Sequence, residues 1–167
     1  MRGLMITPGN NEKANYQAAT GTAVLPVRAR AGCRRVEGPT CSTPIRTVVV
    51  DDSPAVLKTL SSLLERREDV QLVGTATDGY HGLRRVRELE PDLVLTALRL
   101  EGMNGLELSR HIKARPQAPA VIMVTAKDTP ECRAAARAAG VDGFVGKRHL
   151  LTRLPTAIRT LFPPSSE

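Results

Sequence analysis

Aromatic side chains are scarce in this chain of 167 residues. Tryptophan is absent, and tyrosine and phenylalanine together make up 2% of the residues. A folded core must therefore be packed from leucine, valine, isoleucine and alanine, which suffices, because burying one branched aliphatic side chain contributes about 1.5–3 kcal/mol. No basic run is interleaved with aromatic residues, so the sequence does not indicate a stacking platform for nucleic acid.

Cysteine and histidine are equally sparse. Cys33, Cys41 and Cys132 are an odd and widely spaced set, and the three histidines form no cluster. This pattern excludes a disulfide framework and the ligand spacing of a zinc site. No apolar stretch approaches the roughly 20 residues of a membrane helix, and the N-terminus has no continuous apolar core of the signal-peptide kind. We therefore expect a cytoplasmic protein without membrane association.

The first part of the chain, residues 1–44, shows neither helical nor strand periodicity. It holds six Lys or Arg and only two Asp or Glu, and contributes much of the net charge of +7. A segment rich in Gly, Pro, Thr, Asn and Arg buries too little apolar surface to offset its ordering entropy. We expect a disordered basic N-terminal extension here and a short tail at residues 164–167. An alternative role for the extension is contact with nucleic acid.

From residue 45, short β-branched runs alternate with segments of helical periodicity. Turn and capping signals separate them, such as Ser53-Pro54, Asp78 before the second helix and Gly140 after the fourth. The expected strands span residues 45–50, 70–76, 93–98, 120–125 and 143–145. The expected helices span residues 54–64, 79–90, 106–114, 130–139 and 150–161, with Pro155 either kinking the last helix or marking its start.

This fivefold (βα) order predicts an α/β fold with a five-stranded parallel, doubly wound sheet and helices on both faces. In such a sheet, ligand groups gather beyond the carboxyl ends of the strands. The residues found there are Asp51 and Asp52 after the first strand, Ala97 at the end of the third, Thr125 at the end of the fourth and Lys147 after the fifth. Adjacent carboxylates, a hydroxyl and an ammonium suit a divalent cation and a phosphoryl group.

Five motifs in this order resemble the receiver domain of two-component response regulators over about residues 45–163. The matching stretches are Val48–Ser53, Pro91–Leu95, Gly102–Leu108, Val121–Ala126 and Ala139–Lys147. The resemblance implies a flavodoxin-like (βα)5 fold of three α/β/α layers. It also implies a role in phosphorelay signal transduction as a regulatory binding module rather than as an enzyme.

The resemblance implies a role for each rim residue. Asp51 and Asp52 would hold Mg²⁺, Thr125 would be the switch hydroxyl, Phe144 the aromatic that rotates with it, and Lys147 the ammonium of the phosphate pocket. The family's phosphoaccepting aspartate, however, falls on Ala97. A methyl group has no nucleophilic oxygen and ligates no metal.

We therefore expect a pseudo-receiver that aspartyl phosphorylation does not switch and that binds Mg²⁺ weakly. Thr96 is adjacent to the vacant position, but its side chain should point to the other face of the sheet. Lys147 should pair with Asp51 or Asp52 or face water, and Arg99, Glu101 and Asp128 are loop residues near the rim. A competing hypothesis is a Mg²⁺-dependent phosphotransfer protein that uses Asp52 as its nucleophile.

The resemblance also implies where partners bind. Receivers act through their fourth helix, fifth strand and fifth helix, which here correspond to Pro130–Phe162. A protein partner is expected on that surface, with a second copy of the chain as one alternative. The chain ends at Glu167, so we expect no DNA-binding domain and no direct action as a transcription factor.

Overall fold

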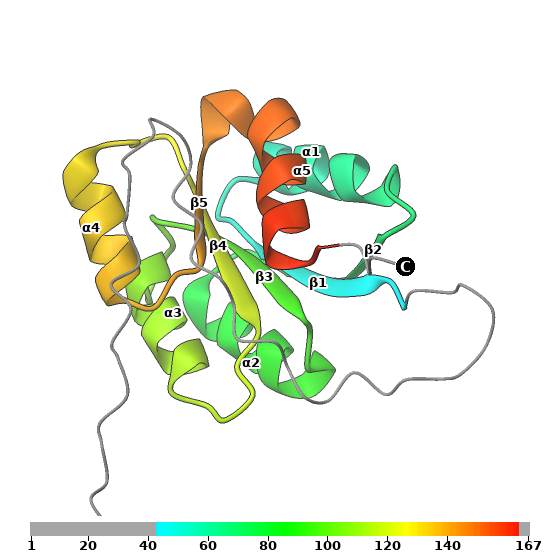
Figure 1. Ribbon diagram of the computed structural model, residues 1–167. Helices are drawn as coiled ribbons and strands as arrows, with labels where there is room; N and C mark the ends of the chain where they lie inside the picture. Colours follow the sequence, from blue (N-terminus) through cyan, green and yellow to red (C-terminus); the bar gives the residue numbers. More distant parts are fainter. Residues whose placement is uncertain (1–42, 164–167) are drawn as a thin grey trace, which may run out of the picture.

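Strands and helices alternate throughout the computed structural model, which describes residues 43–163 (Figure 1). The elements are β1 (Ile45–Val50), α1 (Pro54–Glu65), β2 (Val70–Ala76), α2 (Gly79–Leu89), β3 (Leu93–Ala97), α3 (Gly105–Lys113), β4 (Ala120–Thr125), α4 (Pro130–Ala138), β5 (Gly143–Gly146), the 3₁₀ turn η1 (Lys147–His149) and α5 (Leu150–Leu161). The disordered extension was predicted for residues 1–44 and the tail for residues 164–167; residues 1–42 and 164–167 lie outside the described residues.

The five strands form one parallel sheet in the order β2-β1-β3-β4-β5. This confirms the predicted α/β class and the doubly wound topology. Because all five strands are parallel, their carboxyl ends lie along one rim, and the strand order changes direction between β1 and β3. The register places Val50 beside Thr96 and Ala97 beside Val124.

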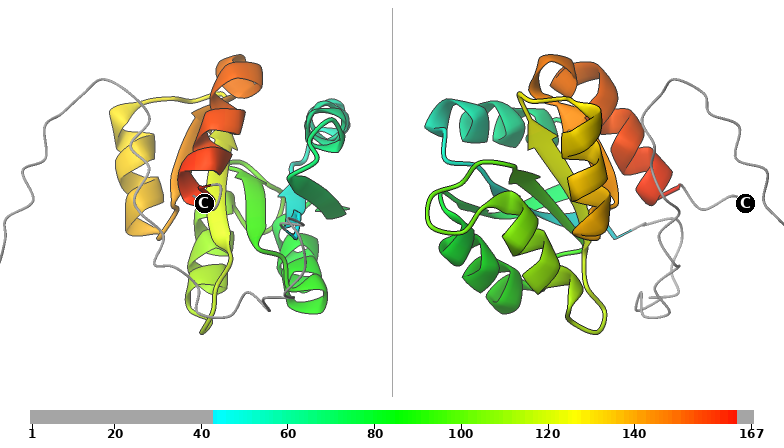
Figure 2. Two further views of the ribbon diagram at one scale, coloured as in Figure 1. Left: turned by 45° about the vertical axis from the view of Figure 1, so that its right-hand side comes forward. Right: turned by 90° about the vertical axis from the view of Figure 1, so that its left-hand side faces the viewer.

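Alternate residues of each strand feed two separate hydrophobic cores, one on each face of the sheet. Val48 and Val50 belong to the core that packs against α2, α3 and α4, whereas Val49 belongs to the core under α1 and α5. Figures 1 and 2 show α1 and α5 together on one side of the sheet and α2 and α3 on the other. The three α/β/α layers are therefore present as predicted, and they are packed almost entirely from aliphatic side chains.

Helix starts follow the capping signals in the sequence, with one exception. The Asp78 carboxylate accepts a hydrogen bond from the His81 amide at 2.7 Å, and Asn104 with Glu107 forms a complete capping box at α3. Ser53 occupies the N-cap position of α1, but its side chain caps no amide. Its backbone N–H instead donates to Asp51 Oδ1 at 2.9 Å, so the start of α1 fixes a site carboxylate.

Helix α4 ends in a Schellman arrangement. The Gly140 amide donates to the Arg137 carbonyl at 2.9 Å, and the Val141 amide donates to the Ala136 carbonyl at 3.0 Å. Gly140 has φ +81°, a left-handed conformation that glycine adopts without steric cost. This glycine turns the chain from α4 directly into β5.

Helix α5 runs through Pro155 rather than starting there. It begins at Leu150, after the 3₁₀ turn, and Pro155 lies inside it. Of the two alternatives left open by the sequence, a kink at Pro155 or a start there, the start at Pro155 is wrong. Burial of Leu150 and Leu154 anchors the first turns of the helix against the sheet, which offsets the single backbone hydrogen bond that proline removes.

Within the described residues, none of the helices has the length and apolar character that a membrane span requires.

Candidate functional site

The rim above the carboxyl ends of the strands holds a pocket of about 260 Å³. Its lining residues come from the ends of β1, β3, β4 and β5 and from the loops that follow them: Asp52, Ala97, Leu98, Arg99, Val124, Thr125, Ala126, Lys127 and Lys147. Four of the six residues predicted for the site therefore meet at one pocket. Asp51 and Phe144 are not among the lining residues, although Asp51 contacts Lys147, which lines the pocket.

The acidic pair at the end of β1 is split between two environments. Asp51 is 1% exposed, whereas Asp52 is exposed and lines the pocket. Lys147 Nζ lies 2.8 Å from Asp51 Oδ2. This contact is an ion pair, and no other donor within the described residues reaches Oδ2. Of the alternatives that the sequence left open for Lys147, the structure contains the pair with Asp51.

Ala97 lies at the carboxyl end of β3, where its 3% exposed side chain contributes to the pocket. Helix α3 begins directly over this strand end, because Gly105 N–H donates to the Leu98 carbonyl at 2.9 Å. A Cβ added at Gly105 would lie 2.0 Å from the Ala97 carbonyl oxygen. The glycine therefore permits a close approach that fixes the backbone around position 97.

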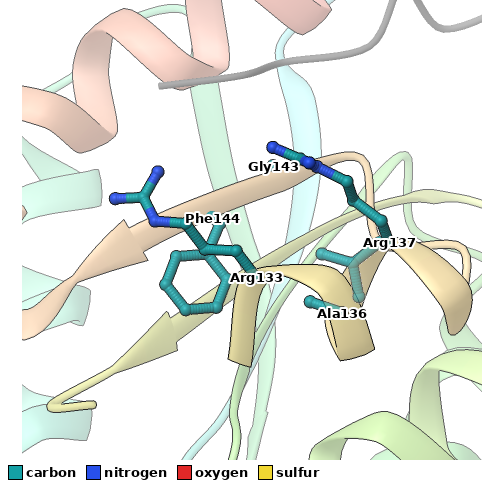
Figure 3. Close-up of a pocket in the computed structure, with 6 residues that line it drawn as sticks. Arg133, Ala136, Arg137, Gly143 and Phe144 are labelled. Atoms are coloured by element: carbon teal, nitrogen blue, oxygen red, sulfur yellow. The ribbon is translucent and has the colours of Figure 1, made fainter. Parts of the chain in front are cut away.

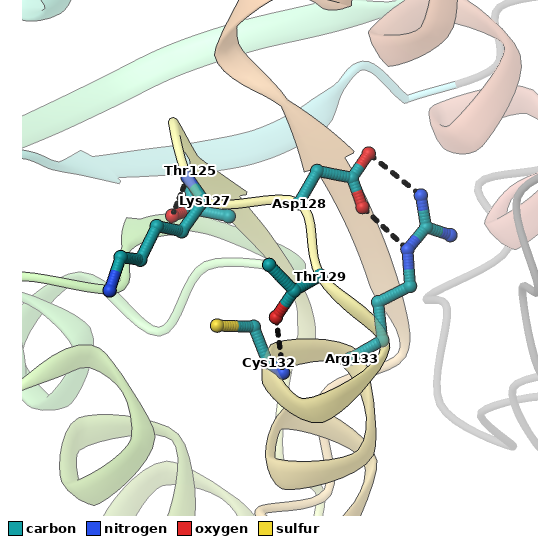
Figure 4. A network of polar contacts seen from close by, with 6 residues as sticks. All are labelled: Thr125, Lys127, Asp128, Thr129, Cys132 and Arg133. Atoms are coloured by element: carbon teal, nitrogen blue, oxygen red, sulfur yellow. Dashed lines mark hydrogen bonds and ion pairs between the residues drawn. The ribbon is translucent and has the colours of Figure 1, made fainter.

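The switch candidate Thr125 is buried, and its hydroxyl already has a partner. Thr125 Oγ1 accepts a hydrogen bond from the Lys127 amide at 3.1 Å, within its own β4–α4 loop (Figure 4). The neighbouring Thr96 is buried too, and its hydroxyl donates to the Ala97 carbonyl at 3.2 Å. Val94, two residues before Thr96, belongs to the core against α2 and α3. Leu95, two residues before Ala97, belongs to the core under α1 and α5. The alternation places Thr96 on the face opposite to Ala97.

Phe144, the only aromatic side chain on β5, is 7% exposed and lies under a guanidinium. The Arg133 guanidinium carbon is 5.2 Å from the centre of the Phe144 ring (Figure 3). At such a distance the cation is attracted to the ring face. Phe144 is therefore held inward, between the hydrophobic core and a side chain of α4.

Arg133 also binds the carboxylate at the start of the same loop–helix unit. Its Nε donates to Asp128 Oδ1 at 2.6 Å and its Nη2 donates to Oδ2 at 2.8 Å (Figure 4). This bidentate pair holds the pKa of Asp128 below the 3.8 of a free aspartate, chiefly through the hydrogen bonds, and the charges of Arg153 and His149 add to the effect. Asp128 therefore faces α4 and α5 rather than the vacant position at Ala97.

Sequence reasoning missed Arg133 and Lys127. Arg133 follows Asp128 by five residues across a capped helix start, a spacing that no local helical rule pairs. The Thr129 hydroxyl accepts from the Cys132 amide at 3.3 Å and thereby sets the direction of the first turn of α4. That turn brings Arg133 back over Asp128. Arg99 lines the pocket as expected. Glu101 does not line it, and its backbone forms an isolated parallel β-bridge with Asp78.

The donor set of the site fits Mg²⁺ only in part. Asp51 and Asp52 supply hard carboxylate oxygens, and Mg²⁺ is commonly held by one or two carboxylates together with water and phosphate. Asp51 Oδ2, however, already faces Lys147. Within residues 43–163, no group of three or more Asp, Glu, His or Cys side chains is placed to hold a metal ion.

Comparison with known proteins agrees with the geometry of the rim. The family model of the response regulator receiver domain matches residues 47–159, which is more than half of the chain. A solved response regulator of the LuxR family from Aurantimonas sp. SI85-9A1 is 32% identical, with a TM-score of 0.66 and coverage of 70% of this chain and 84% of that chain. The response regulator domain of Thermotoga maritima CheB is 25% identical, with a TM-score of 0.66, 74% coverage of this chain and 99% of that chain.

Among curated proteins, the chain is similar to larger regulators. It is 40% identical over 103 residues to a protein-glutamate methylesterase/protein-glutamine glutaminase of Koribacter versatilis, which covers 62% of this chain and 28% of that protein. It is 37% identical over 81 residues to the transcriptional regulatory protein LiaR of Bacillus subtilis, covering 48% of this chain and 38% of that protein. The chain matches well under half of the length of these relatives. Fold, motif order and the match to the family model together establish that the chain belongs to the response regulator receiver domain family of two-component signalling.

Proposed function

We propose that this receiver domain acts in two-component signalling as a protein-interaction module whose state does not depend on aspartyl phosphorylation. The observation that carries the proposal is Ala97, which occupies the end of β3 inside the rim pocket together with Asp52, Thr125 and Lys147. A phosphoryl group needs a nucleophilic oxygen at that position, and the alanine methyl supplies none.

The contacts of Lys147, Thr125 and Phe144 support a domain that stays in one conformation. Lys147 is paired with Asp51, and Thr125 is bonded to the Lys127 amide. Phe144 is buried under Arg133, which is itself tied to Asp128. A switch needs two arrangements of similar free energy, and these contacts all favour the arrangement in which the lysine, the hydroxyl and the aromatic ring are already engaged.

We propose that Mg²⁺ binds this site weakly. Asp52 and Asp51 would be its protein ligands, and binding would require Lys147 to move away from Asp51. The third carboxylate that would offset this cost is missing at Ala97. A titration that follows the backbone amide resonances of residues 51–53 tests this directly, and the Ala97→Asp variant should bind Mg²⁺ more tightly than the natural sequence.

The partner surface follows from the same proposal. A protein partner would bind across α4, β5 and α5, over Pro130–Phe162, and a second copy of the chain is the alternative occupant. The methylesterase activity of the curated relatives belongs to proteins of which this chain matches about a third or less. We propose no catalytic activity for residues 43–163.

Exposure to acetyl phosphate and Mg²⁺, followed by intact mass measurement, tests the proposal. The expected result is an unmodified natural protein and a hydroxylamine-labile phosphoadduct on the Ala97→Asp variant. A labile adduct on the natural protein that disappears in the Asp52→Asn variant would instead establish Asp52 as the acceptor, because Asp52 is the exposed carboxylate of the pocket.

A further inference from the structure

A second hollow lies outside the rim pocket, on the outer side of α4. It has a volume of about 450 Å³ and is lined by residues of α4, of the loop before it and of η1–α5: Asp128, Pro130, Arg133, Arg137, His149 and Arg153. Figure 2 shows α4 and α5 on either side of β5. We call these six residues the α4–α5 groove.

The groove is strongly basic. Three arginines and one histidine face a single carboxylate, Asp128. Over the whole stretch Pro130–Phe162 the sequence holds six Lys or Arg and two Asp or Glu. The charges of Arg153 and His149, which line the same groove as Asp128, help to lower the pKa of that carboxyl.

Of the three arginines in the groove, one has its guanidinium group paired with a carboxylate, and two form no ion pair within residues 43–163. Arg133 is held by Asp128 and stacks on Phe144, so its position is fixed by the fold. Arg137 is exposed one turn further along α4, and Arg153 is half-buried on α5. Neither forms an ion pair within residues 43–163. Figure 3 shows Arg137 next to Arg133 on α4, above Gly143 and Phe144.

The exposed side chains of α4 around these arginines include small, apolar alanines. Beside the groove, Ala136, Val141, Gly143 and Phe144 are buried and line, together with Arg133 and Arg137, a hollow of only about 10 Å³. Of the residues of α4, only Ala136 is buried, and its outward positions include Ala134 and Ala138. A partner chain can therefore approach the helix closely while its polar groups reach the two available guanidinium groups.

We infer that the α4–α5 groove binds an acidic segment of a different protein, with carboxylates paired to Arg137 and Arg153. This inference rests on the proposed function as an interaction module and names the chemistry of its partner. Charge complementarity carries the assignment, because guanidinium groups bind carboxylates through two parallel hydrogen bonds. It also argues against a second copy, since a twofold interface would place the same basic groove on both sides.

A nucleic acid fits the groove less well. The carboxylate of Asp128 stands among the arginines and repels a continuous phosphate backbone. Phe144 is buried and presents no ring on which a base stacks. The exposed methyl groups of Ala134 and Ala138 on α4 offer apolar contact to the aliphatic side chains of a peptide. A protein segment is therefore the occupant that the groove favours.

Fluorescence anisotropy with a labelled peptide of glutamate and alanine tests this inference on the full-length protein. The natural protein should bind this probe, and binding of the peptide with glutamine in place of glutamate should be absent. Arg137→Glu and Arg153→Glu should each weaken binding about tenfold or more, because each removes a charge-assisted pair. Arg110→Glu, an equal charge change on the exposed surface of α3, should weaken it less than about twofold.

Three outcomes overturn the inference. The first is an equal loss of peptide affinity in Arg110→Glu and Arg137→Glu, and the second is equal affinity of the natural protein for the glutamine and glutamate peptides. The third is an Arg137→Glu variant that loses binding to duplex DNA while its peptide binding is unchanged. Self-association that Arg137→Glu changes, measured by sedimentation velocity, would assign the groove to a second copy instead. Thermal unfolding of each variant excludes misfolding as the cause of a loss. A phosphoadduct on the natural protein would refute the proposed function but leave peptide binding unaffected, so the two failures are distinguishable.

Discussion

Lys147 and Asp51 form an ion pair across the rim of the sheet, with the ammonium nitrogen 2.8 Å from a carboxylate oxygen that no other donor within the described residues reaches. Asp51 is almost completely buried, while the lysine side chain keeps 26% exposure. The pair joins the end of β1 to the residue after β5, two strand ends that are separated by β3 and β4 in the sheet.

Replacing Lys147 by methionine should therefore leave a buried charge without its counter-ion. We expect a loss of unfolding free energy of about 1–3 kcal/mol, measured by urea denaturation at neutral pH. The additional change Asp51→Asn should recover part of this loss, because it removes the uncompensated charge. An unchanged midpoint for the single lysine variant would show that the pair contributes nothing to stability.

Sequence reasoning reached the strands, the helix caps and the residues of the rim because each depends on local signals. β-branched runs, Asp78, Asn104 and Gly140 act within a few residues of their position, and parallel topology then brings distant strand ends together. The choice between Asp51 and Asp52 as the partner of Lys147 was not predictable, since the chain leaves the sheet after Val50 and alternation no longer decides which side chain turns inward.

The contacts of Arg133 with Asp128 and Phe144 were also not predictable from the sequence. They depend on the direction in which α4 leaves its N-cap, and on the distance between that helix and β5.

Pro155 illustrates a different limit of prediction from sequence. Propensity alone favours a break at proline, but burial of Leu150 and Leu154 before it holds the first turns of α5 in place. Tertiary packing therefore outweighed a local rule.

Gly105→Ala should destabilise the domain through the end of β3. The added methyl would lie 2.0 Å from the Ala97 carbonyl oxygen, a backbone atom that yields only if α3 shifts. We expect an unfolding free energy lower by about 1–3 kcal/mol in urea denaturation. As a control, Ala134→Gly on the exposed side of α4 should cost no more than about 1 kcal/mol, through helix propensity alone. Similar losses for both variants would contradict the close contact.

The Asp128–Arg133 pair predicts a specific dependence on pH. The pKa of Asp128 is lowered in the folded protein, so the pair stabilises the fold above the pKa of the unfolded state and this contribution is lost as pH falls through the folded pKa. The difference in stability between the natural protein and Asp128→Asn should therefore be constant above about pH 5 and shrink below it. Because the pair is largely exposed to solvent, the difference should stay below about 1 kcal/mol. A difference that grows on acidification would contradict the assignment.

Under the proposed function, Ala97→Asp should produce a receiver that responds to a phosphodonor. The new carboxylate would enter the pocket beside Asp52, Thr125 and Lys147 and compete with Asp51 for the lysine. Without Mg²⁺, three carboxylates near one ammonium repel one another, so we expect the variant to be less stable than the natural protein in the metal-free state and to regain stability on addition of Mg²⁺. The natural protein should show a much smaller thermal shift with Mg²⁺. Thermal unfolding of both proteins, with and without Mg²⁺ and acetyl phosphate, measures this. An equal Mg²⁺ shift for both proteins would mean that position 97 does not control the metal site.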